Sequence, residues 1–214
     1  MNIKLKPNFN TAFGSYDDND NSYRDANNVL YDMVRKNPFH NNEDWIVAKF
    51  WVIGRTYAAA VERCKHTNSG DFYYNSIVPL FRKNNLDQKI TNITSRYKEI
   101  SLDALKEVLA LHKELVDLIK QATKKENISF VSKYLHFHMP ELVFIYDSRA
   151  HSAIDKFVDS NIRKSDFSGI NCNNEYAKFA FKAFEIYNKL KSMNYSSQHG
   201  DTLPRIVDNF LLRN

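Results

Sequence analysis

An amphipathic pattern of helical period between residues 101 and 125 constrains the fold more than any other feature of the sequence. Ser101 and Asp103 stand where an N-cap and a first acidic turn are expected, and the run KKEN closes the segment. Lysines mark one face, and the opposite stripe is apolar and consists of Leu105, Val108, Leu109, Leu115, Ile119 and Ala122. The pattern predicts one long amphipathic helix.

The remaining patterns also favour helices. With only 5 Gly and 5 Pro among 214 residues, and 43% hydrophobic residues, the chain does not suit a loop-rich all-β architecture. We expect an all-α fold, a single compact bundle of about eight or nine helices. Residues 43–64 are apolar on nearly every side around Trp45 to Val61, which predicts a buried central helix. The run from His66 to Asp71 predicts a loop.

The first 21 residues differ from the rest. They are rich in Asn and Asp and lack an apolar period, so residues 1–21 predict a polar N-terminal arm with little regular structure that packs through Phe9 and Phe13. Residues 22–214 are expected to form one all-α domain.

Charge and cysteine content limit the class of protein. The formal net charge is +5, which is mildly basic and compatible with a polyanionic partner. Cys64 and Cys172 lack metal-ligand spacing and suit a reducing compartment, and the first residues contain no apolar signal segment. The most apolar run carries Lys49 and Arg55, so no membrane span is expected. We expect a cytoplasmic protein.

The stretch from Ser129 to Ile154 holds the densest mixture of apolar, aromatic and ionisable residues, and Pro140 divides it. His136 and His138 invite a metal hypothesis, in which His151 or Asp147 completes the site of a metal-dependent hydrolase. Two residues apart on a helix, however, their side chains diverge by about 200°. The sequence therefore favours hydrogen-bonded core histidines, with no metal and no cofactor predicted.

Lys133 and Asp147 flank the histidines and the proline. Burial lowers the pKa of a lysine and makes its amine a usable nucleophile, and a nearby carboxylate can stabilise charge or act as a base. The same two residues can instead form a buried ion pair. Asp147 is also a good N-cap for a helix that begins at Ser148. These alternatives remain open at the level of sequence.

Short basic clusters elsewhere are candidates for phosphate contacts. They include Lys124 and Lys125 before the Ser129 stretch, Arg163 and Lys164 in an irregular connection, and a helical ridge of Lys178, Lys182 and Lys189. A solvated helix face with local ion pairs is the alternative interpretation of the ridge.

A partial resemblance joins these observations. The order SFVSK, a dozen mostly apolar residues and then YDSRA, between Ser129 and Ala150, resembles part of the helix-hairpin-helix base-excision DNA glycosylases. The resemblance implies an all-α fold, a DNA-facing hairpin at residues 129–133, and Lys133 as the amine that attacks the sugar carbon. It implies that Asp147 supports the oxocarbenium-like centre. Ser129, Ser132 and Arg149 then join the candidate DNA contacts. Serine and valine replace the hairpin glycines.

Two hypotheses follow. In the first, the chain binds nucleic acid through its basic loops in a glycosylase-like helical architecture, with base excision by Lys133 and Asp147 left open. In the second, it is a non-catalytic helical protein that binds a protein partner or forms a homodimer.

Overall fold

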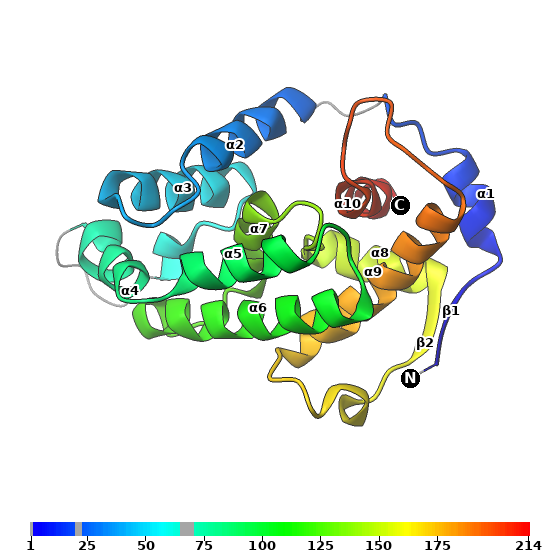
Figure 1. The fold of residues 1–214 in the computed structure, drawn as a ribbon. Helices are drawn as coiled ribbons and strands as arrows, with labels where there is room; N and C mark the ends of the chain where they lie inside the picture. The colour runs from blue at the N-terminus through cyan, green and yellow to red at the C-terminus, as the bar shows by residue number, and fades with distance from the viewer. Residues whose placement is uncertain (1, 20–22, 65–70) are drawn as a thin grey trace.

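The computed structural model describes residues 2–19, 23–64 and 71–214, and only the main chain of Cys64. The predicted loop from His66 falls almost wholly outside these residues. The described chain is predominantly helical, with a two-stranded sheet at one edge (Figure 1). It contains ten α-helices and not the eight or nine expected. They are α1 Asn8–Gly14, α2 Arg24–Lys36, α3 Glu43–Thr56, α4 Val78–Arg82, α5 Leu86–Arg96, α6 Leu102–Thr123, α7 Ile128–His138, α8 Ser148–Phe157, α9 Asn174–Ser192 and α10 Leu203–Leu212. None of the helices in these ranges is long and apolar enough to cross a bilayer.

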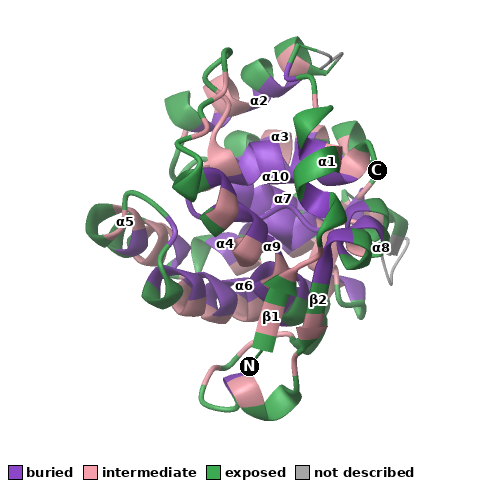
Figure 2. Cartoon of the chain, turned by 90° about the vertical axis from the view of Figure 1, so that its right-hand side faces the viewer, coloured by how far each residue is buried: buried purple, intermediate pink, exposed green. Residues whose placement is uncertain are grey.

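The central helix is α7, and the prediction that residues 43–64 form it is wrong. Every residue from Phe130 to Phe137 in α7 is buried, and α7 packs against α2, α3 and α6. Helix α3 is half-exposed instead, with Trp51 51% exposed, and it ends at Thr56. The chain turns at Ala58, whose φ is +51°, before a short 3-10 turn from Val61 to Cys64. Figure 2 shows α7 within the buried centre.

The N-terminal segment is also more ordered than its composition predicts. Strand β1, Asn2–Leu5, pairs antiparallel with β2, Val158–Asn161, with Leu5 opposite Val158. Figure 2 shows the two strands side by side at the N-terminus. Helix α1 follows and buries Phe9 and Phe13, the two residues that the sequence singled out. The ring of Phe9 meets those of Phe157 and Phe210, so long-range aromatic contacts order this segment.

Local signals placed most helix ends correctly. The side chain of Ser101 caps α6, and that of Asn173 caps α9. Helix α7 stops at His138, ahead of Pro140, and an extended segment leads to α8. Thr202 caps α10, which holds Pro204 in its first turn. The predicted irregular connection at residues 160–173 contains the end of β2 and a 3-10 turn over Lys164–Phe167.

Candidate functional site

Lys133 and Asp147 meet across the break at Pro140. The Nζ atom of Lys133 lies 4.0 Å from Oδ2 of Asp147, and the two side chains are 3% and 23% exposed. The lysine comes from the middle of the buried helix α7, and the aspartate stands immediately before α8. Lys133 also donates a hydrogen bond of 2.7 Å to Oγ of Ser129, one turn earlier in the same helix. A buried amine and a partly exposed carboxylate thus face each other.

Asp147 is at the same time the N-cap of α8, as its position predicted. Its Oδ1 atom accepts hydrogen bonds from the backbone N–H groups of Arg149, at 2.9 Å, and Ala150, at 3.0 Å. Because these bonds satisfy donors that the first turn leaves free, they fix the orientation of the carboxylate. The second oxygen is left to face the amine of Lys133.

Three residues distant in sequence complete the surroundings of the amine. The ring centroid of Tyr57 lies 5.6 Å from Nζ of Lys133 and 5.9 Å from Cζ of Arg205. Arg205 forms a buried ion pair of 2.7 Å with Asp208, one turn along α10. Nε of Arg205 and Oδ1 of Asp208 are buried and lack hydrogen-bond partners within the described residues. The amine therefore lies beside a closed polar cluster with unused hydrogen-bonding capacity.

Burial controls the ionisation of this cluster. It lowers the pKa of Lys133, although the negative charges of Asp147 and Asp208 oppose the shift. Burial raises the pKa of Asp208 to about 6, against the influence of Arg205. Both shifts favour neutral forms, and a neutral lysine amine is the form that can act as a nucleophile.

A second buried lysine, which the sequence did not mark as a site, offers a comparison. Lys49 is fully buried in α3 and donates to the carbonyl oxygens of Asn37 and Phe39, each at 3.1 Å. Burial lowers its pKa to about 8. The charge of Asp87 raises the pKa of Lys49, but Asp87 is bonded to His40 and not to Lys49. Lys49 therefore has a lowered pKa without a carboxylate in contact, which distinguishes it from Lys133.

The two histidines of α7 are core residues. Nδ1 of His136 donates to the carbonyl oxygen of Val143 at 2.8 Å, and its Nε2 accepts from the hydroxyl of Tyr31 at 2.6 Å. Nδ1 of His138 donates to the carbonyl oxygen of Tyr134 at 2.8 Å. Burial lowers the pKa of His136 to about 3. Within the described residues, no group of three or more His, Cys, Asp and Glu side chains is arranged to hold a metal ion.

The segment where the resemblance implies a hairpin is helical. Residues 129–133 belong to the continuous helix α7. Ser132 is fully buried, its hydroxyl donates to the carbonyl oxygen of Ser129 at 2.9 Å, and the N–H of Tyr146 bonds to it at 2.9 Å. The hydroxyl of Ser132 thus bonds the connection between α7 and α8 to the core.

The basic candidates lie on several elements. Lys124 and Lys125 are exposed at the end of α6, and Arg163 and Lys164 are exposed after β2. Two other basic candidates already interact within the chain. Arg149 donates to the carbonyl oxygen of Leu212 at 2.7 Å, and Lys182 forms an ion pair with Asp155 on α8. Lys178 is exposed on α9. The structure brings Lys133, Asp147 and Ser129 together, whereas the basic residues stay dispersed.

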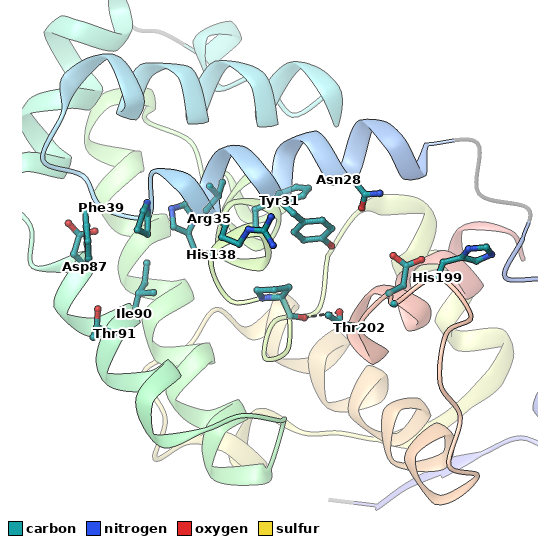
Figure 3. A pocket seen from close by; sticks show the side chains of 16 residues that line it. Asn28, Tyr31, Arg35, Phe39, Asp87, Ile90, Thr91, His138, His199 and Thr202 are labelled. Atoms are coloured by element: carbon teal, nitrogen blue, oxygen red, sulfur yellow. Dashed lines mark hydrogen bonds between the residues drawn. The ribbon is translucent and has the colours of Figure 1, made fainter.

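A cavity of about 380 Å³ lies under α2 (Figure 3). Figure 3 shows Tyr31 and Arg35 on α2 above it, Asp87 of α5 at one end and His199 at the other. Phe137 and His138 of α7 also line it. Sequence patterns did not point to this cavity, because its walls come from α2, α5, α7 and the segment before α10.

Comparison of the chain with protein-family models, with curated proteins and with solved structures finds no match.

Proposed function

We propose that the chain binds nucleic acid and that Lys133 and Asp147 carry base-excision chemistry of the glycosylase type. The observation that carries this proposal is the 4.0 Å approach of the Lys133 amine to the Asp147 carboxylate, in surroundings that lower the pKa of the amine. An amine of lowered pKa beside a fixed carboxylate has the composition that nucleophilic attack on a sugar carbon requires. Asp147, the more exposed partner, marks the side from which a substrate would approach.

The roles follow from the chemistry of the two groups. The lone pair on Nζ of Lys133 forms a bond to C1′ of the nucleotide, and the bond from C1′ to the base nitrogen breaks. The base leaves with the electrons of the broken bond and takes up one proton, which balances the proton that Nζ loses once it is bonded to C1′. The carboxylate of Asp147 stabilises the positive charge that develops on the sugar. At an abasic site the same amine condenses with the C1′ aldehyde, with loss of water.

Nucleic-acid binding is tested by its dependence on salt. Phosphate contacts release counterions, so the logarithm of the affinity for an abasic-site duplex should fall linearly with the logarithm of the salt concentration. The double variant Lys124→Ala, Lys125→Ala should weaken binding and reduce that slope by about 1 to 2. Lys98→Ala is the control, because Lys98 is an exposed lysine that, among the residues described, bonds only to the Thr94 carbonyl. It should change neither the affinity nor its dependence on salt. Absence of binding at low salt would reject the proposal.

One observation favours a second function. Large apolar side chains are exposed on α2 and α3, including Val29, Trp45 and Trp51. The almost complete burial of Lys133 is also consistent with a purely structural ion pair with Asp147. Exposed apolar groups of this size suit a protein partner or a second copy of the chain. Light scattering coupled to chromatography that gives a stable dimer, without bound nucleic acid, would support this alternative.

A further inference from the structure

The cavity under α2 has the properties of a small-molecule site. Its volume of about 380 Å³ lies within the range of about 300 to 1,000 Å³ that such sites occupy. Aromatic rings form much of its wall: Tyr31 from α2, Phe39 from the following link, and Phe137 and His138 from α7. Flat faces of this kind favour a planar ligand, because a ring can stack on them with little loss of conformational freedom.

Most polar groups around the cavity are already engaged. The hydroxyl of Tyr31 bonds to His136, and that of Thr202 donates to the carbonyl oxygen of Pro140 at 3.0 Å, as Figure 3 shows. Asp87 accepts from the N–H of His40 at 2.9 Å. Arg35 donates to Asp32 at 2.6 Å, and Asp32 does not line the cavity. These groups shape the site without needing a ligand.

Among the ionisable residues that line the cavity, Asp201 is the one without a bonded partner in the described part of the chain. It lines the cavity from the segment before α10 and makes no hydrogen bond to any residue that the structure describes. One carboxyl oxygen, Oδ2, is buried without a partner. Arg205, whose positive charge acts on Asp201, is committed to Asp208 by an ion pair. The other oxygen, Oδ1, has no partner among these residues either and is not enclosed in the same way, so it is the oxygen to which a ligand in the cavity can donate.

We propose that the cavity binds a small planar aromatic or heteroaromatic molecule that carries an ammonium or N–H group, with its ring against Tyr31 and Phe137 and its donor on Asp201. The aromatic faces also attract a cationic group. Neither Lys133 nor Asp147 lines this cavity.

Three indole probes of similar size separate ring from charge: tryptamine, neutral 3-ethylindole and anionic indole-3-propionate. Titration calorimetry with the full chain should show one tryptamine site per chain. Indole-3-propionate should bind at least tenfold more weakly, with 3-ethylindole between the two. Asp201→Asn should weaken tryptamine roughly tenfold or more, because a hydrogen bond to a charged group is lost. Asp25→Asn, at an exposed acidic residue of α2 outside the cavity, should leave it unchanged.

A second variant tests the site in case Asp201→Asn lowers the affinity by disturbing the fold. Thr91 is exposed on α5 and lines the cavity, so Thr91→Phe should fill the space and abolish tryptamine binding while the melting temperature stays within a few degrees of wild type. The proposal is overturned if none of the three probes binds at millimolar concentration. Equal affinity for the amine and the acid, or an unchanged affinity in both variants, would overturn it as well.

Discussion

The two carboxyl oxygens of Asp147 have different partners: Oδ1 caps helix α8, and Oδ2 lies 4.0 Å from Nζ of Lys133. One side chain thus positions a helix and faces a buried amine. Because the cap fixes the carboxylate, the charge of Asp147 cannot turn away from Lys133 without loss of the hydrogen bonds at the start of α8. The cap and the charge can therefore be separated by substitution.

Asp147→Asn removes the charge and keeps an oxygen that can cap the helix, whereas Asp147→Ala removes both. Since a lost N-cap costs about 1 kcal/mol, the alanine variant should be less stable than the asparagine variant by about that amount. Urea unfolding of both proteins measures the difference. Equal free energies of unfolding would show that Oδ1 does not stabilise α8. In both variants the pKa of Lys133 should fall further, because Asp147 raises it.

The buried histidines predict a loss of stability in acid. Burial lowers the pKa of His112 and His136 to about 3, below the ordinary value of 6.5. The unfolded chain therefore binds more protons than the folded chain between pH 6.5 and pH 3, and stability falls as the pH decreases through that window. Each histidine should contribute roughly 2 kcal/mol of loss at pH 5.

Asp208 acts in the opposite direction. Its pKa is raised to about 6 in the folded state, so its protonation stabilises the fold as the pH falls from about 7 to 4, but one carboxyl does not outweigh two histidines. Denaturation at pH 7 and pH 5 should show a net loss. His136→Gln should reduce the pH dependence, because it removes one of the two histidines whose pKa burial lowers. A chain that is equally stable at both pH values would contradict this account.

The N-terminal helix α1 should be strongly coupled to the core. Phe9 is 1% exposed and packs against Phe157 and Phe210, so Phe9→Ala should lower the free energy of unfolding by about 3 to 5 kcal/mol. Asn10→Ala, at the adjacent exposed position, is the control and should change it by less than about 0.5 kcal/mol. If the two variants have the same stability, the aromatic contacts of α1 do not stabilise the fold.

Gly54 permits a close approach within the α3 region. A Cβ atom at this position would lie 3.1 Å from Cα of Ala60, which belongs to the backbone. Gly54→Ala should therefore destabilise the chain, despite a gain in helix propensity of about 1 kcal/mol. Gly14→Ala offers the matched control, since nothing lies within 4 Å of its added Cβ. Differential scanning calorimetry should give a lower melting temperature for the first variant and an equal or higher one for the second.

Local chemistry made much of the fold predictable. The caps at Ser101 and Asp147 depend on residues within one helical turn, and both are confirmed. The choice of the central helix was not predictable in the same way. Both α3 and α7 are rich in apolar residues, and only the tertiary packing decides that Trp51 faces outward while Phe130 to Phe137 are enclosed.

The candidate site was also predictable only in part. Pro140 indicated a break between Lys133 and Asp147, but the sequence left open whether the break brings them together. Asp208 acts on the amine from α10, and the ring of Tyr57, from the turn after α3, lies 5.6 Å from it. No spacing in the sequence connects these residues, because their proximity depends on helices that are distant along the chain.

The central claim is that the amine of Lys133 acts as a nucleophile, and borohydride trapping tests it most directly. A duplex with one abasic site is incubated with the chain, the imine is reduced, and the linked peptide is identified by mass spectrometry. Lys133→Met should abolish the adduct, whereas Lys49→Met, at the other buried lysine of lowered pKa, should retain it in a folded protein. We predict a single adduct on Lys133. An adduct on another amine, or none under conditions where the duplex binds, would contradict the account.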